Sequence, residues 1–428
     1  MRFRRLQWTA PEQLAAEISE WFADEGEPID VSGIGREVEE RGDDALVELT
    51  RRFDAPEADG IELEVTRGEA RAALERVEPT VSEALGIAIA NVSQVARAQL
   101  GGEQVVELPQ GQKVTVGAAP MSSAGIYAPG GRASYPSSVI MGCITARVAG
   151  VERVVLVTPP GSDGRIDPVT LAAASLCDVD EIFAVGGAQA IFALARGTET
   201  IRPVDVIAGP GNAWVQAAKK AVCGEVAIDS LAGPSDLTVV FDRETNLNWV
   251  ALDLCAQAEH GAESLLVAVA VNGGDLDGLR AEVERIAGIE ASVKDCRLAL
   301  LEAPSGSEAI ALANELAPEH LQLMDESSAS QAVDVRTAGC VFTGPVAATA
   351  FGDYIAGSNH ILPTDGTGKS FGPVSPATFR RSTARVSLTS GSADALAEPL
   401  NALAKAEGLP VHGLSAIARK EYEQNSNS

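Results

Sequence analysis

The four histidines of this chain all lie beside other residues that can bind a metal ion or transfer a proton. They are His260, His320, His360 and His412, in a chain of 428 residues. Histidines that only fill a core usually stand singly among apolar neighbours, and these four do not. Because imidazole binds metals and exchanges protons near neutral pH, the pattern indicates chemistry at several separate places in the sequence.

Gln257 and His260 form a candidate metal-binding pair at the end of a helix predicted over residues 247–260. Apolar residues recur on one face of this segment, and Gly261 provides a stop signal. Residues three apart lie on the same edge of a helical turn, so both side chains can reach one ion. The alternative is a polar helix end whose dipole stabilises a charged imidazole, and the segment alone favours that interpretation.

A carboxylate and an imidazole, Glu319 and His320, follow Pro318 in an otherwise apolar stretch. Imidazole titrates near neutral pH, and burial can raise the pKa of a carboxyl group towards the same range, so the two groups can share successive proton transfers. A solvated turn is the alternative, and the local sequence favours neither interpretation.

Polar residues also gather in two glycine-containing turns nearer the end of the chain. Asp353, between Gly352 and Tyr354, is a candidate metal carboxylate, and a turn-capping aspartate is the commoner alternative. Glu407 and His412 flank a short turn between two predicted helices, which could equally be an ordinary surface turn. Two imidazoles, one carboxylate and one amide would leave a zinc ion with net positive charge and room for substrate donors.

The middle of the chain has the pattern of a parallel α/β fold. Strands predicted over 182–185 and 204–208 each end in a glycine turn, and helices predicted over 189–195 and 213–222 follow. Helix N-termini at such turns can bind an anion, although no clean Gly-x-Gly-x-x-Gly motif is present. A second alternation of strands and helices begins at 237–241. Earlier segments predict helices over 10–25, 33–52, 67–77 and 80–99, and a hairpin over 102–118.

We therefore predict an α/β protein with two Rossmann-like parallel-sheet domains. The expected division has four parts: a helical N-terminal arm over 1–25, a first α/β domain over 26–118 with 236–365, a nucleotide-binding α/β domain over 119–235, and a C-terminal dimerisation segment over 366–428.

The composition excludes several classes of partner. The formal net charge is −27, so neither nucleic acid nor an anionic membrane is an expected partner. This charge would repel itself unless screened, which favours adaptation to high salt over ordinary solubility. The six cysteines are scattered, with no Cys-x-x-Cys pair, which indicates a cytoplasmic protein and argues against a closed structural zinc site. No uncharged apolar run is long enough to span a bilayer.

Taken together, these motifs resemble the histidinol dehydrogenase family in order and spacing over nearly the whole chain. The matching segments are 125–131, 135–141, 185–190, 209–212, 232–235, 257–261, 317–321, 352–364 and 407–412. The sequence departs from the family pattern at positions without an expected ligand or proton-transfer role, namely Trp214 for Tyr, Thr145 for Pro, Asp236 for Glu and Lys369 for Arg.

The resemblance implies a zinc-dependent enzyme that oxidises L-histidinol through the aldehyde to L-histidine and reduces two NAD+. It implies Glu319 and His320 as the acid/base pair, zinc ligands at Gln257, His260, Asp353 and His412, and NAD contacts at Tyr127, Gln189 and Asn212. The implied substrate contacts are Ser235, Gln257, His260, His320, Asp353, Glu407 and His412. Family members form intertwined homodimers with shared active sites, so the resemblance also implies that Glu407 and His412 could act on the partner's site.

Three alternatives have distinct consequences. A related dehydrogenase for another amino- or sulfonate-bearing alcohol should lack the contacts at Glu407 and His412, which this chain has. A zinc hydrolase that uses Glu319 to activate water would need no nucleotide. A non-catalytic α/β binding protein would not need the Glu319–His320 pair.

Overall fold

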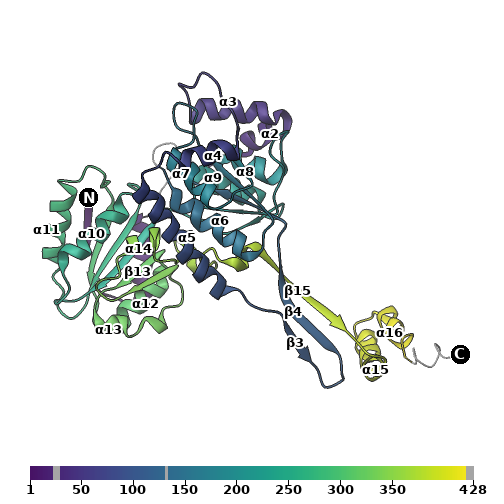
Figure 1. Ribbon diagram of the computed structural model, residues 1–428. Helices are drawn as coiled ribbons and strands as arrows, with labels where there is room; N and C mark the ends of the chain where they lie inside the picture. Colours follow the sequence, from purple (N-terminus) through teal and green to yellow (C-terminus); the bar gives the residue numbers. More distant parts are fainter. Residues whose placement is uncertain (23–28, 131–133, 421–428) are drawn as a thin grey trace. The chain divides into compact units, whose positions relative to one another are not determined.

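A computed structural model describes residues 1–22, 29–130 and 134–420, which form two compact units (Figure 1). The first unit contains residues 1–99 and 121–379, and the second contains residues 100–120 and the chain from Arg380 onward. Residues 23–25 of the predicted N-terminal helix and Gly131 of one matching segment lie outside the described residues. So do residues 421–424 of the helix predicted over 413–424, after His412.

The first unit contains a six-stranded parallel sheet in the order β1-β12-β11-β10-β13-β14. Its strands are β1 (Arg2–Arg5), β10 (Asp236–Phe241), β11 (Leu265–Ala270), β12 (Arg297–Glu302), β13 (His320–Leu323) and β14 (Cys340–Thr343). Both faces are covered, which is why the central strands are almost continuously apolar. The helices associated with this sheet are α1 (Pro11–Phe22), α10 (Leu247–Ala258), α11 (Leu276–Ala287), α12 (Gly306–Leu316), α13 (Glu326–Ala329) and α14 (Thr349–Tyr354).

A second sheet of the same unit has the order β2-β7-β6-β5-β8-β9, with β2 antiparallel at its edge. Its strands are β2 (Glu64–Val65), β5 (Ser123–Tyr127), β6 (Arg153–Thr158), β7 (Glu181–Ala184), β8 (Val206–Ala208) and β9 (Ala227–Ile228). The chain proceeds outward from β5 to β7 and then returns to the other side of β5 at β8. This reversal is the topological switch point at which open α/β sheets bind ligands.

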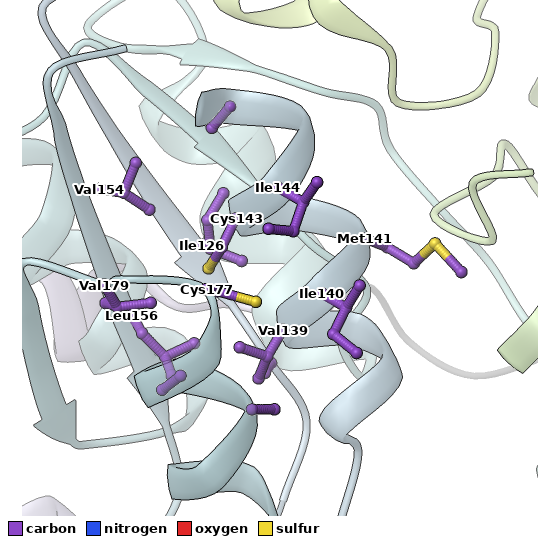
Figure 2. Close-up of a cluster of buried hydrophobic side chains, with 14 of the residues drawn as sticks. Ile126, Val139, Ile140, Met141, Cys143, Ile144, Val154, Leu156, Cys177 and Val179 are labelled. Carbon is purple, nitrogen blue, oxygen red and sulfur yellow. The ribbon is translucent and has the colours of Figure 1, made fainter. Parts of the chain in front are cut away.

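Helix α6 (Pro136–Ala149) is buried almost all round. Figure 2 shows its Val139 and Cys143 in one cluster with Ile126 of β5. Val139 and Cys143 are both fully buried. At Gly142 an added Cβ would lie 2.5 Å from Ile126 Cγ2, so glycine permits the close approach of helix and strand. The other helices that follow strands of this sheet are α7 (Pro168–Leu176), α8 (Gly187–Arg196) and α9 (Ala213–Val222).

The helices between residues 32 and 99 pack on the second sheet's helices, whereas the sequence-based division grouped residues 26–118 with the first sheet. They are α2 (Ser32–Arg41), α3 (Asp43–Phe53), α4 (Arg67–Leu74) and α5 (Pro79–Gln99). Leu46 and Leu49 share a core cluster with Phe192, and Leu85 and Val92 share one with the residues of α6. Apolar periodicity predicted these helices but could not show which sheet they cover.

Two local features differ from the sequence-based prediction. The helix predicted over 33–52 is interrupted at Gly42, whose φ of +52° ends α2 before α3 begins. The strand β1 was not predicted, because three of its four residues are arginines and show no apolar pattern. It forms by pairing in parallel with β12 at the edge of the first sheet.

The second unit is a three-stranded antiparallel sheet followed by a helical hairpin. The predicted hairpin over 102–118 is confirmed as β3 (Gln104–Glu107) and β4 (Lys113–Pro120), and β15 (Arg380–Ser387) pairs with β4. Helices α15 (Ser390–Ala406) and α16 (Pro410–Ile417) pack against each other. The first unit also contains three short 3-10 helices, at Ala332–Asp334, Thr367–Lys369 and Pro376–Phe379.

Nearly all of the negative charge lies at the protein surface. The chain has 60 aspartates and glutamates, and the buried ones among the described residues are Asp236, Asp253, Glu319 and Asp325, together with Asp229, whose side chain is 2% exposed. In the described part of the chain, no helix has the length and apolar character that a membrane span needs. The surface carboxylates therefore repel one another across solvent, where dissolved salt can screen them.

We predict that the melting temperature rises with KCl, by roughly 5 °C or more between about 0.1 M and 1 M, because the screening length falls from about 10 Å to about 3 Å. Differential scanning fluorimetry at pH 7.5 measures this shift. The matched control is the same titration near pH 5, closer to the sequence pI of about 4.5, where the shift should be smaller. Equal shifts at both pH values would contradict the charge-repulsion explanation.

Candidate active site

Glu319 and Asp236 hold each other at the amino ends of two neighbouring strands of the first sheet. The backbone N–H of Glu319 donates to Asp236 Oδ1 at 2.7 Å, and the N–H of Asp236 donates to Glu319 Oε2 at 3.0 Å. The Ser235 hydroxyl also donates to Glu319 Oε2. Burial raises the pKa of Glu319, although the charge of His320 and these hydrogen bonds oppose the rise. The result is a buried carboxyl group in one fixed orientation.

His320 lies between two carboxylates, with only 2% of its surface exposed. Its Nδ1 is 3.8 Å from Glu319 Oε2 and has no hydrogen-bond partner among the described residues, whereas its Nε2 is 3.3 Å from Asp353 Oδ1. Burial lowers the pKa of His320, but the charge of Glu319 and the hydrogen bond and charge of Asp353 outweigh it and raise the pKa to about 9. Without a bound cation, His320 is therefore protonated at neutral pH.

Asp353, on α14, is oriented through its backbone by His360. The His360 Nδ1–H donates to the carbonyl oxygen of Asp353 at 2.6 Å, so its Nε2 accepts from the Ser138 hydroxyl at 3.1 Å. Burial lowers the pKa of His360, which keeps this ring neutral. Burial raises the pKa of Asp353, but the hydrogen bond and charge of His320 lower it further than burial raises it. Asp353 is thus an ionised carboxylate in a largely buried place.

Gln257 lies in the last turn of α10, and His260 lies just beyond its end, close enough to Asp353 to affect the pKa of that carboxyl group. Gln257 is buried, and its Nε2 donates to Ser235 Oγ at 2.5 Å, so only its carbonyl oxygen could serve as a metal ligand. His260 is exposed, and its charge contributes to the low pKa of Asp353. Within the described residues, no group of three His, Cys, Asp or Glu side chains is arranged to hold a metal ion.

The second unit carries the two remaining residues of the expected site. Glu407 follows α15 and His412 lies on α16, and both are exposed to solvent. They line an apolar groove of about 480 Å³ between the two helices. Within one unit, therefore, the structure brings together Ser235, Gln257, Glu319, His320 and Asp353, with His260 nearby, but Glu407 and His412 belong to the other unit.

The expected nucleotide contacts lie at the carboxyl edge of the second sheet, beside its switch point. Tyr127 ends β5, and its hydroxyl oxygen accepts from the N–H of Gly187 at 3.2 Å, at the start of the helix that carries the buried Gln189. Asn212 caps α9 after the neighbouring strand β8, and its side-chain oxygen accepts the N–H groups of Trp214 and Val215 at 3.1 Å each.

Three polar residues of these sites had no role in the sequence-based interpretation. Asp236 was noted only as a departure from the family pattern, and His360 only as a histidine with polar neighbours. Asp54, after α3, is partly buried, and its Oδ2 has no hydrogen-bond partner among the described residues. Burial raises the pKa of Tyr127 to about 12. The hydrogen bond from Gly187 opposes this rise, and the charge of Asp54 adds to it. No local motif could have shown any of these contacts.

Burial also raises the pKa of Asp54 itself, to about 6. The folded state therefore binds the carboxyl proton of Asp54 more tightly than the unfolded state does. Ionisation of Asp54 destabilises the fold fully above about pH 6, and this destabilisation disappears as the pH falls below 3.8. We predict that Asp54→Asn stabilises the protein at pH 7.5 by about 1–2 kcal/mol, after allowance for partial solvent access. Urea unfolding at pH 7.5 and pH 4.5 measures the gain, which should be smaller at the lower pH. A loss of stability at pH 7.5 would show that Asp54 has a stabilising partner.

Comparison with known proteins gives a consistent result over nearly the whole chain. A family model described as histidinol dehydrogenase matches residues 24–420. Histidinol dehydrogenase of Nitrosomonas europaea is 41% identical over 91% of each chain, and that of Rhodospirillum rubrum is 42% identical over 91% of each chain. The crystal structure of histidinol dehydrogenase from Elizabethkingia anophelis has a TM-score of 0.90 at 30% identity, covering 100% of this chain and 99% of that one. The chain therefore belongs to the histidinol dehydrogenase family of oxidoreductases.

Proposed function

We propose that this chain is a zinc-dependent, NAD-linked histidinol dehydrogenase that oxidises L-histidinol through L-histidinaldehyde to L-histidine, the last step of histidine biosynthesis. The observation that carries the proposal is the buried imidazole of His320 between the carboxylates of Glu319 and Asp353, in a chain of this family. A non-catalytic binding protein would have no use for such an arrangement, because burying three titratable groups together is unfavourable.

His320 is the proposed base for the first oxidation. It takes the hydroxyl proton of the alcohol while the carbon loses a hydride, and only a neutral imidazole can do so. The carboxylates that raise its pKa to about 9 would raise it less once a cation offset the charge of Asp353.

Glu319 is the proposed base for the second oxidation. The aldehyde must first gain water: Glu319 takes a proton from that water as its oxygen bonds to the aldehyde carbon, and the protonated His320 gives its proton to the former carbonyl oxygen, which restores the neutral imidazole. His320 then takes a hydroxyl proton of the resulting hydrate as the second hydride leaves. Because burial raises the pKa of Glu319, its carboxylate is a stronger base than one in solvent.

The donor set in the first unit fits a zinc ion. Asp353 supplies an ionised carboxylate, His260 an exposed imidazole and Gln257 an amide oxygen, and His412 of the second unit would supply the fourth donor. The small number of His and Asp ligands in one unit agrees with the lack of a three-residue metal cluster among the described residues. When bound, zinc would act as a template that orients the imidazole and amine of the substrate. The proposed substrate contacts are Ser235, Gln257, His260, His320, Asp353, Glu407 and His412.

Tyr127, Gln189 and Asn212 are the proposed NAD contacts, supported by their position beside the switch point of the second sheet. NAD+ accepts one hydride in each oxidation. A zinc hydrolase built on Glu319 would need no such site, and a dehydrogenase for a different alcohol would not need Glu407 and His412.

A homodimer with shared active sites is supported by the apolar surface of the second unit. A sheet and two helices this small cannot enclose a full core, and large apolar side chains remain exposed. These are Val105, Val106, Val386, Leu388, Leu403, Val411 and Leu414. A second copy of the chain would cover them, and Glu407 and His412 would then complete the partner's site.

All six cysteines are free, which supports a cytoplasmic location.

We predict that the purified protein with L-histidinol, NAD+ and zinc forms two NADH for each histidine, because two hydrides leave the same carbon. Absorbance at 340 nm and chromatography of histidine measure the ratio. His320→Asn should lower turnover by roughly 10²–10⁴-fold while zinc content stays unchanged. One NADH per product would contradict the two-step reaction, and loss of zinc in the variant would contradict the assignment of His320 as a base.

We further predict that two inactive variants, Asp353→Asn and His412→Asn, restore activity when their subunits are exchanged. If each site combines the first unit of one chain with the second unit of its partner, a hybrid dimer has one intact site, and a random mixture recovers about a quarter of wild-type activity. Each variant alone should also contain less zinc. Native mass spectrometry confirms hybrid formation. Hybrids without activity would mean that His412 serves the site of its own chain.

A further inference from the structure

Lys219, on α9, is a charged side chain buried in the second sheet's domain. Only 1% of its side chain is exposed, and its ammonium lies 2.6 Å from Oδ1 of Asp229, whose side chain is 2% exposed. Lysine is almost never buried to this extent unless it is paired and hydrogen-bonded. Two apolar residues could fill the same space without any desolvation penalty, so the charges call for a more specific explanation than stability.

The pair binds both peptide groups of a single glycine. The Lys219 ammonium donates to the carbonyl oxygen of Gly209 at 2.6 Å, and the N–H of Gly209 donates to Asp229 Oδ2 at 2.8 Å. The other oxygen of Asp229 also accepts the N–H of Ser230 at 2.7 Å. Gly209 is therefore clamped on both sides by opposite charges.

Gly209 also contacts Tyr127 directly. Its φ is +130°, and a Cβ at this position would lie 1.9 Å from the Tyr127 carbonyl oxygen. There is no room for a side chain between Gly209 and Tyr127, so the two backbones lie against each other. The hydrogen bonds from Lys219 and to Asp229 fix Gly209, and they therefore set how closely the turn after β8 approaches the end of β5. Three residues later the same turn delivers Asn212. The clamp thus controls the spacing between two of the proposed NAD contacts.

A second side chain of α9 extends this arrangement towards the first sheet. Gln216 donates through Nε2 to the Gly211 carbonyl oxygen at 3.3 Å and accepts the N–H of Ala232 at 2.9 Å. Ala232 lies just before Ser235, which donates to Glu319. Helix α9 therefore holds the turn and the segment leading to Ser235 in one frame.

We propose that Lys219 and Asp229 are positioning residues for the nucleotide, which hold the Gly209 turn at the distance from Tyr127 that NAD requires. This inference rests on the proposed function, in that Tyr127 and Asn212 contact NAD. Neither residue touches the reacting atoms, so their loss weakens NAD binding and leaves the proton transfers at Glu319 and His320 intact.

The experiment compares wild type with the double variant Lys219→Met/Asp229→Asn. The double variant leaves no uncompensated buried charge, whereas Lys219→Met alone leaves Asp229 unpaired and should unfold at a lower temperature. The control is Lys220→Met, an exposed lysine of the same helix. In the double variant, the KM for NAD+ and its dissociation constant by calorimetry should rise roughly 10-fold or more, while kcat and the KM for histidinol change less than about threefold.

Other outcomes separate the two claims. A folded double variant with wild-type affinity for NAD+ would overturn the positioning role and leave the proposed function untouched. A roughly 10-fold fall in kcat with unchanged KM values for NAD+ and histidinol would also overturn the positioning role. If wild type binds no NAD+, the proposed function and the positioning role both fail. Near-UV circular dichroism and the melting temperature establish that the double variant is folded.

Discussion

The contact on which the candidate site depends is that of His320 with the carboxylates on either side of it. Its two nitrogens lie 3.8 Å from Glu319 Oε2 and 3.3 Å from Asp353 Oδ1, and burial removes the solvent that would otherwise screen them. The three groups therefore titrate together, and a change in the charge of one alters the basicity of the others. Both carboxylates are held through backbone contacts, Glu319 by Asp236 and Asp353 by His360. The surrounding fold holds these three side chains in fixed positions relative to one another.

The proposed proton-transfer residues and the proposed nucleotide contacts lie at opposite ends of the strands that carry them. Ser235 and His320 lie at the amino ends of β10 and β13, whereas Tyr127 and Asn212 lie at the carboxyl ends of β5 and β8. An oxidation that transfers a proton and a hydride needs a base and a nucleotide beside the same C–OH group. The segment from Asp229 to Ser235 connects them, and it is bound to α9 at several points. Its position within the first unit is thus constrained from both ends.

The second unit has a different physical problem. Its sheet and helical hairpin bury few residues of their own, and side chains such as Val411 and Leu414 remain exposed beside Glu407 and His412. Apolar area on such a small unit is stabilised best by another surface. A second chain that covered this apolar surface would also bring its own site close to Glu407 and His412. The proposed shared active site therefore follows from the same association that buries the apolar side chains.

The sequence by itself determined the alternation of strands, glycine turns and helices around Gly187 and Gly209, the helix edge shared by Gln257 and His260, and the adjacency of Glu319 and His320. These are local features, set by periodicity, turn chemistry and neighbouring positions. Only the tertiary structure decided that His320 meets Asp353, that α2 to α5 pack on the second sheet's helices, and that β1 joins the edge of the first sheet. Contacts of this kind depend on which faces pack together and on strand register, and many distant pairings are compatible with the same local pattern.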